Sequence, residues 1–155
     1  MRTLEGQLSV RDARFCLLAA RFNDRIVEDL VRGACDALRR HGVEDSAIDL
    51  VRVPGAFELP LAARRAARMR QYDGLVALGV VIRGATPHFD FVCSECAGGL
   101  ARVSLEFEIP VGFGVLTCDT VDQAVERSGV KHGNKGADAA LAAMEMVSLL
   151  RQFGP

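Results

Sequence analysis

The chain has 155 residues, half of them hydrophobic and a quarter of them charged, and this length is enough to bury a core as one domain. Its 19 basic and 20 acidic side chains exclude the strongly basic composition typical of proteins that bind nucleic acid or anionic membranes. No apolar run approaches the length of a membrane span, and residues 1–7 lack the apolar core of a signal peptide. We therefore expect a cytoplasmic protein that binds small molecules or other proteins.

The first half of the chain predicts two strand–helix units. An apolar run over residues 14–20 is typical of a strand, and hydrophobic residues recur at helical spacing over residues 26–38, with Asn23 as the expected helix cap. A second strand is predicted over residues 48–53. Helical spacing then resumes over residues 58–70.

The second half continues this alternation. Residues 75–82 form a near-continuous apolar run, as expected for a strand covered on both faces, and a helix follows over residues 89–105. A fourth strand is predicted over residues 111–117, a short helix over residues 120–128 and a last helix over residues 135–151. Strands that alternate with helices predict an α/β fold, here a three-layer αβα sandwich with a flavodoxin-like four-stranded parallel sheet.

Five cysteines lie in these elements, namely Cys16, Cys35, Cys93, Cys96 and Cys118. Their odd number and apolar surroundings favour buried, reduced thiols over a disulfide framework. Cys93 and Cys96 have the spacing of a redox motif or of half a zinc site, but no second pair follows them and they fall inside a predicted helix. We therefore favour core positions for most of the cysteines and expect no metal site.

The turn after the third strand carries the most informative pattern. Thr86 is suited to cap the following helix, and Pro87 is suited to its first turn. The free amides of residues 84–86 would then bind an anion at the positive end of the helix dipole, with His88 beside it as a proton-transfer group. The same residues fit a plain strand-to-helix turn whose histidine caps or packs, and both interpretations stay open on these residues alone.

Distinctive residues also follow the other predicted strands. Ligands of parallel sheets bind at the carboxyl ends of the strands. There the chain places Phe22 after the first strand, residues 55–58 after the second, residues 84–88 after the third and residues 117–118 after the fourth. A ligand site is therefore predicted at this end of the sheet.

Five motifs together resemble the lumazine synthase family in their order and spacing: residues 21–23, 54–58, 84–90, 110–117 and 133–136. The resemblance runs nearly end to end, which implies a single domain over residues 1–155 with an N-terminal arm at residues 1–12. It implies an enzyme, a transferase that condenses 5-amino-6-ribitylamino-2,4-pyrimidinedione with 3,4-dihydroxy-2-butanone 4-phosphate. The products would be 6,7-dimethyl-8-ribityllumazine, phosphate and water, in the penultimate step of riboflavin biosynthesis, without a metal or organic cofactor.

The resemblance also assigns roles to single residues. His88 would be the catalytic acid and base. The pyrimidinedione and its ribityl chain would be bound by Phe22, which stacks on the ring, and by Asn23, Ala56, Phe57, Glu58, Val81, Ile82, Phe113 and Lys135. The phosphate would be bound by Gly84, Ala85, Thr86 and Arg127. Without the resemblance, Phe22 fits a core position, Glu58 a first-turn acid and Arg127 a solvated surface charge.

The resemblance further implies a homo-oligomer, in which Phe113, Arg127 and Lys135 come from a neighbouring subunit. A pentamer closed into an icosahedral shell is favoured, because the bend at residues 129–134 is short; riboflavin synthase is a further candidate partner. Two alternatives remain. An archaeal-type riboflavin synthase would have no phosphate to bind, and a non-catalytic flavin or lumazine carrier would not need His88.

Overall fold

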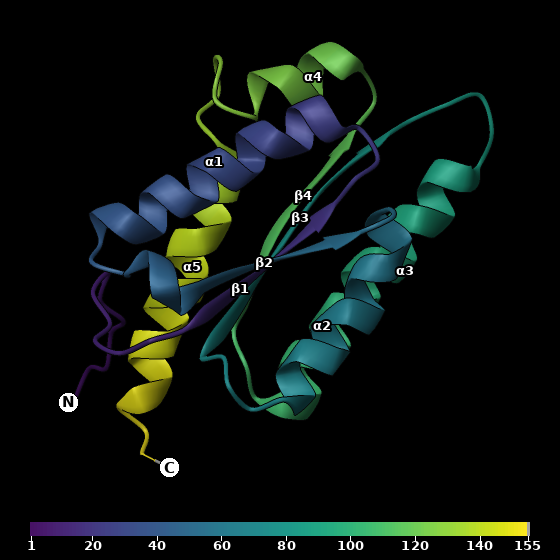
Figure 1. The fold of residues 1–155 in the computed structure, drawn as a ribbon. Helices are drawn as coiled ribbons and strands as arrows, with labels where there is room; N and C mark the ends of the chain where they lie inside the picture. The colour runs from purple at the N-terminus through teal and green to yellow at the C-terminus, as the bar shows by residue number, and fades with distance from the viewer. Residues whose placement is uncertain (155) are drawn as a thin grey trace.

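Strands and helices alternate along the whole chain (Figure 1). The computed structural model describes residues 1–154; Pro155, the last residue of the predicted domain, lies outside them. The strands are β1 (Phe15–Ala20), β2 (Ile48–Val53), β3 (Gly74–Ile82) and β4 (Val111–Cys118). The helices are α1 (Asp24–Arg40), α2 (Leu59–Arg68), α3 (His88–Phe107), α4 (Val121–Glu126) and α5 (Lys135–Arg151), with short 3-10 turns at Asp45–Ala47 and Ala56–Glu58.

The four strands form one parallel sheet in the order β2-β1-β3-β4. β1 lies between β2 and β3, so that Leu17 pairs with Leu50 on one side and with Val76 on the other. This order and the all-parallel pairing confirm the predicted α/β fold. The central strands β1 and β3 are almost entirely apolar because helices cover both of their faces.

Two hydrophobic cores lie on the two faces of the sheet. Figure 1 shows the sheet nearly edge-on, with α1 and α5 on one side and α2 and α3 on the other. On the first side Leu30 of α1 and Met144 of α5 are fully buried, and Ala124 brings α4 into the same core. On the second side Leu59 of α2 and Leu100 of α3 are buried against the sheet. The turns at the carboxyl ends of β1, β2 and β3 are therefore flanked by elements that are buried in these two cores.

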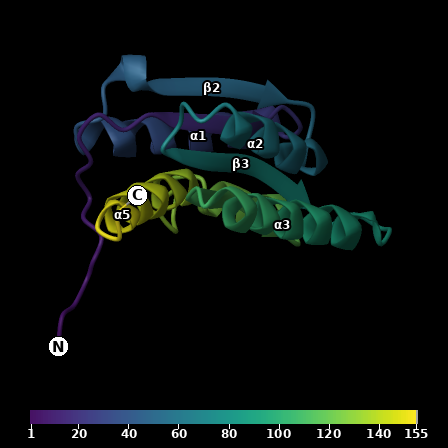
Figure 2. The same ribbon diagram turned by 90° about the horizontal axis from the view of Figure 1, so that it is seen from below.

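The N-terminal residues form an extended arm. The amide of Gln7 donates to Ser148 Oγ at 3.0 Å, and Gln152 Nε2 donates to the carbonyl of Glu5 at 2.6 Å. These contacts hold the arm against α5, and Figure 2 shows its first residues running on past that helix, away from the sheet. Within residues 1–154, no helix is both long and apolar enough to cross a membrane.

Most predicted boundaries agree with the structure to within a few residues, but the predicted cap of α3 is wrong and that of α1 is correct only in its position. The Thr86 hydroxyl does not cap α3, since Pro87 occupies the N-cap position and no side chain caps the helix there. Asn23 does occupy the N-cap position of α1, but its backbone is left-handed (φ 59°) and its side chain donates to β3 instead of accepting from the helix. The capping box of Thr120 and Gln123 at the start of α4 is confirmed, although α4 ends at Glu126 rather than residue 128.

Candidate active site

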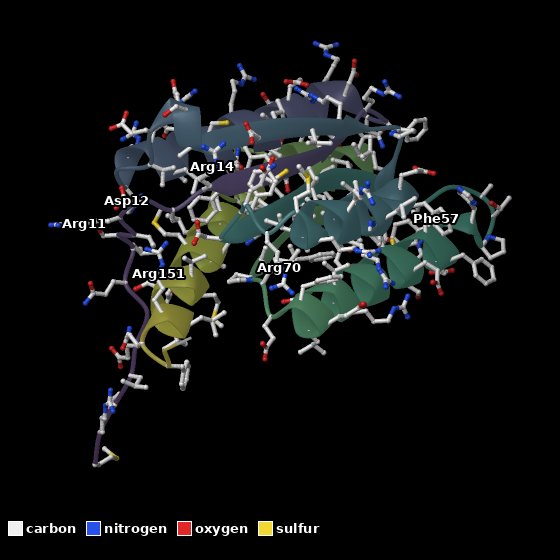
Figure 3. All side chains as sticks on the ribbon, turned by 60° about the horizontal axis from the view of Figure 1, so that its bottom comes forward. Arg11, Asp12, Arg14, Phe57, Arg70 and Arg151 are labelled. Carbon is white, nitrogen blue, oxygen red and sulfur yellow. The ribbon has the colours of Figure 1, made fainter. Side chains whose placement is uncertain are left out.

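A cleft of about 610 Å³ opens at the carboxyl ends of β1, β2 and β3. It is lined by Phe22, Pro54, Gly55, Ala56, Phe57, Glu58, Val80, Val81, Ile82, Gly84, Thr86, His88, Phe89, Phe91 and Val92. Nine of these residues are predicted site residues, and they come from three stretches of the chain, one at the carboxyl end of each of β1, β2 and β3. Figure 3 shows Phe57 at this end of the molecule, whereas Arg14 and Arg151 lie at the opposite end. The cleft lies where ligands of parallel sheets bind.

The first wall of the cleft is built by hydrogen bonds that continue past the strand ends. The amide of Arg21 donates to the carbonyl of Val53 at 2.8 Å, and the amide of Phe22 donates to the carbonyl of Pro54 at 3.1 Å. These bonds hold the β1–α1 turn beside the β2–α2 loop. The ring of Phe22 remains 73% exposed, so it is not a core phenylalanine and offers its face to a ligand.

Asn23 supports the cleft from outside it. Its Nδ2 donates to the carbonyl of Val80 at 3.0 Å, which ties the β1–α1 turn to β3. The left-handed backbone of Asn23 suits an asparagine better than most residues. Asn23 is therefore adjacent to the site, but its side-chain amide donates to the protein and Asn23 does not line the cleft.

The β2–α2 loop supplies a carboxylate and a second aromatic ring. The 3-10 turn at Ala56–Glu58 leads directly into α2, and the amide of Glu58 donates to the carbonyl of Gly55 at 3.3 Å. This turn leaves the Phe57 ring 59% exposed while Ala56 is buried and Glu58 is half-buried. One short loop thus presents an apolar surface and a hydrogen-bond acceptor to the same cleft.

The β3–α3 turn brings free backbone amides close to His88, and the predicted binding of an anion there stays a prediction. Within residues 1–154, the backbone amides of Gly84, Ala85 and Thr86 donate to no protein acceptor. His88 is exposed, begins α3 and lines the cleft beside Gly84 and Thr86. Ala85 belongs to the same turn but does not line the cleft. The turn therefore combines free amide donors with an accessible imidazole, as anion binding and proton transfer require.

Three predicted site residues lie away from this cleft. Arg127 caps the end of α4, which packs on the α1/α5 face of the sheet, and its Nη1 donates to the carbonyl of Gln123 at 3.0 Å. Lys135 begins α5 and contacts Asp138 at 3.0 Å. Phe113 of β4 lines a separate groove of about 270 Å³ against α3. Their contribution from a neighbouring subunit stays a prediction.

A comparison with protein-family models gives a match to 6,7-dimethyl-8-ribityllumazine synthase over residues 12–151. The match covers nine-tenths of the chain and includes every predicted site residue. The chain belongs to the 6,7-dimethyl-8-ribityllumazine synthase family. The resemblance noted from five motifs is therefore confirmed as family membership, and the matched range leaves out most of the N-terminal arm.

Some residues line the cleft of this lumazine synthase family member but were assigned no role from the sequence: Pro54, Val80, Phe89, Phe91 and Val92, and also Gly55, which was predicted only to lie at this end of the sheet. Phe91 is 68% exposed, and it lies three residues after His88 on the same helix. Residues three and four positions apart share a helix face, so Phe91 and Val92 follow from the position of His88 once α3 is placed. Their spacing from His88 on α3 was the signal that could have found them.

None of the five cysteines of this lumazine synthase family member lines the cleft. Cys93 and Cys96 fall within α3, as predicted, and Cys16, Cys96 and Cys118 are buried. Burial raises the pKa of Cys93 and Cys118, with Arg127 partly opposing the increase for Cys118. Both thiols therefore stay protonated at neutral pH and are poor nucleophiles. Among residues 1–154, no group of three or more His, Cys, Asp or Glu side chains is placed to hold a metal ion.

Proposed function

We propose that this chain is an active 6,7-dimethyl-8-ribityllumazine synthase, which joins the pyrimidinedione to the four-carbon phosphate and releases phosphate and water. The observation that carries the proposal is that one cleft holds an exposed aromatic ring at Phe22, a carboxylate at Glu58, free amides at Gly84 and Thr86, and His88. A flat polar heterocycle and an anion need this combination.

In this proposal the pyrimidinedione lies between the Phe22 ring and the strand end at Val81 and Ile82. Stacking on an aromatic face fixes the plane of the ring, and the apolar strand end excludes water from one edge. Glu58 accepts hydrogen bonds from hydroxyls of the ribityl chain, and the Ala56–Phe57 loop contacts that chain. These contacts bring the free amino group of the heterocycle to the side of the cleft that carries His88.

The four-carbon substrate binds with its phosphate against the β3–α3 turn. Its carbonyl then faces the amino group, and nucleophilic addition followed by loss of water gives an imine. His88 removes and returns protons as the phosphate leaves, and later as the second amino group closes the ring with loss of water. Holding the two reactants side by side supplies much of the remaining rate acceleration.

The proposed enzyme is a homo-oligomer, a pentamer that closes into an icosahedral shell, in which a neighbour supplies Phe113, Arg127 and Lys135. Two placements support a shared site. Arg127 belongs to the α4 side of the sheet, and Phe113 lies in a groove separate from the cleft. Neither residue lines the cleft of its own subunit, and in this proposal the neighbour's copies complete the site. Riboflavin synthase is the further proposed partner.

A turnover assay tests the proposal. The purified protein is incubated with both substrates, and the lumazine product and inorganic phosphate are followed together; equal amounts of the two are expected. The same protein is given 6,7-dimethyl-8-ribityllumazine alone, and formation of riboflavin would instead support the archaeal-type riboflavin synthase. Tight lumazine binding without any turnover would contradict an enzyme and support a carrier. Native mass determination tests the pentamer and the shell.

A further inference from the structure

Arg83 lies between β3 and the turn at residues 84–87, and it is attached to the end of β4. Its backbone amide donates to the carbonyl of Cys118 at 2.9 Å, one hydrogen bond beyond the paired strands. Its side-chain Nε donates to Asp119 Oδ1 at 2.8 Å. Main chain and side chain of Arg83 therefore bind two consecutive residues of one neighbouring segment.

The other edge of the same guanidinium contacts the first turn of α3. Its Nη1 donates to Asp90 Oδ1 at 3.3 Å. Its Cζ lies 4.3 Å from the centre of the Phe89 ring, within the range of a cation–π contact. Phe89 is buried and lines the cleft. Arg83 therefore holds the part of α3 that carries His88.

The turn between these two contacts has few other attachments. The chain leaves β3 at Arg83, and seven residues later Asp90 of α3 contacts the Arg83 side chain. This contact closes residues 84–89 into a loop. This segment contains the three amides without a protein acceptor and the exposed His88. Its geometry therefore depends on Arg83 more than on hydrogen bonds of its own.

The charges around Arg83 argue against direct anion binding. One guanidinium faces two carboxylates, Asp90 and Asp119, so the three groups together carry one negative charge at neutral pH. The hydrogen bond to Asp119 also raises the pKa of Arg83, which keeps it charged. A phosphate on the turn would find no net positive charge here. Loss of Arg83 would instead leave two carboxylates near the phosphate.

We propose that Arg83 is a positioning residue, which sets the turn at residues 84–87 and His88 relative to each other and offsets part of the negative charge of Asp90 and Asp119. The kinetic part of this inference rests on the proposed function. Its structural part, that Arg83 holds the turn, does not.

The kinetic test measures kcat and both KM values in Arg83→Ala and Arg83→Lys. A misplaced reacting group lowers catalysis strongly, so we expect kcat/KM for the phosphorylated substrate to fall about 10- to 100-fold in Arg83→Ala. The KM of the pyrimidinedione should stay within about twofold, since its proposed contacts are untouched. Arg83→Lys should recover only part of the loss, because an ammonium restores the charge but not the two-pronged geometry or the stacking.

Two further variants keep the test decisive. Asp119→Ala removes the carboxylate that accepts from Arg83 Nε, and it should lower kcat/KM by a smaller factor than Arg83→Ala does. If Arg83→Ala does not fold, the kinetics of Asp119→Ala and Arg83→Lys test the positioning role. Arg102→Ala is the matched control, because Arg102 is an exposed arginine of α3 whose nearest carboxylate, that of Glu95, is 4.0 Å away. It should behave as wild type.

Hydrogen exchange of a peptide covering residues 88–96 provides a readout independent of turnover. We expect exchange about fivefold faster in Arg83→Ala and unchanged exchange in Arg102→Ala. The positioning role would be overturned if the wild type is active and Arg83→Ala has the same kinetic constants. It would also be overturned if Arg83→Ala raises both KM values equally. An inactive wild type would contradict the proposed function. In that case hydrogen exchange would test only whether Arg83 holds the turn. An unchanged exchange rate in Arg83→Ala would reject that role.

Discussion

The side chain of Asn134 occupies the space that a Cβ atom on Gly33 would fill. A Cβ built on Gly33 would lie 2.3 Å from Asn134 Cγ, so the glycine of α1 permits the asparagine to reach the helix. From there Asn134 Nδ2 donates to the carbonyls of Asp29 at 2.8 Å and Ser128 at 3.0 Å. Its Oδ1 accepts from the amides of Gly136 and Ala137 in the first turn of α5. One side chain thus joins α1, the bend after Arg127 and the start of α5.

Gly33→Ala should therefore destabilise the fold and loosen this bend. The added methyl group would displace Asn134 and break its hydrogen bonds, at a cost of about 2–4 kcal/mol in the free energy of unfolding. Chemical denaturation measures the change. Gly98→Ala is the control, because Gly98 also lies inside a helix but has open space around its missing Cβ; it should be neutral or more stable by up to about 1 kcal/mol. Equal effects of the two changes would contradict a role for the Asn134 contact.

His88→Ala should lower kcat while binding of both substrates is largely retained. Proton transfer by a placed side chain contributes about two to four orders of magnitude to the rate, and water can replace part of it. Steady-state kinetics measure the effect. His41→Ala serves as the control, since His41 Nδ1 lies 2.7 Å from the carbonyl of Ala37 at the end of α1, away from the cleft. An unchanged kcat in His88→Ala would remove this residue from the catalytic role.

Arg127→Ala should chiefly weaken the phosphorylated substrate. The change removes a charge-assisted contact that is expected to contribute on the order of a few kcal/mol when it is desolvated by the neighbouring subunit. The KM of the phosphorylated substrate should rise strongly, and that of the pyrimidinedione should change little. Arg40→Ala, which removes an arginine paired with Asp36 on α1, should leave both unchanged. If the KM values of the two substrates rise equally in Arg127→Ala, the arginine supports the structure and does not bind phosphate.

Two inactive variants should restore activity when they share one ring. In a one-to-one co-expression of Phe22→Ala and Arg127→Ala, a site is intact when one subunit keeps Phe22 and its neighbour keeps Arg127. Random mixing then leaves roughly a quarter of the sites intact. Activity near that fraction of wild type is expected, with mixing verified by native mass spectrometry. Mixed rings with no more activity than the separate variants would place both residues in one subunit's site.

The buried thiols should make the fold sensitive to alkali. Burial raises the pKa of Cys16 and Cys96 from 9.0 to about 11. A group with a raised pKa in the folded state stabilises the fold fully below its unfolded pKa, and this stability is lost as the pH rises from about 9 toward 11. Melting temperatures at pH about 8 and about 10.5 should show this loss, and Cys96→Ala should lose less. Equal losses in the variant and the wild type would assign the effect to other groups, such as Tyr72.

The strands and helices could be predicted from local sequence patterns, because the local preference of each segment agrees with its place in the packed fold. The predicted second strand and last helix agree with β2 and α5 at both ends, where turn residues and a helix-capping asparagine mark the limits. The capping box at Thr120 was also predictable, since both of its partners lie within one turn. Local chemistry thus decided those element ends where distant contacts leave the capping group free to bind its own helix, as Asn134 Oδ1 does.

Contacts between distant residues decided what the sequence could not show. Asn23 has the chemistry of a helix cap, but the carbonyl of Val80, 57 residues later, accepts from its side chain instead. Arg83 similarly finds Asp119 36 residues away, and no spacing rule links the two. The cleft was predictable in part because parallel strands end together. Phe91 and Val92 were missed because apolar helix residues usually belong to the core.

The three exposed phenylalanines at the cleft have a thermodynamic consequence. Phe22, Phe57 and Phe91 leave apolar surface in contact with water around one opening, and such surface contributes a positive heat capacity while it is hydrated. Whatever covers these rings, a flat heterocycle or a neighbouring subunit, must release that hydration. Its association with the protein should therefore carry a negative change in heat capacity, and its binding enthalpy should become more favourable as the temperature rises.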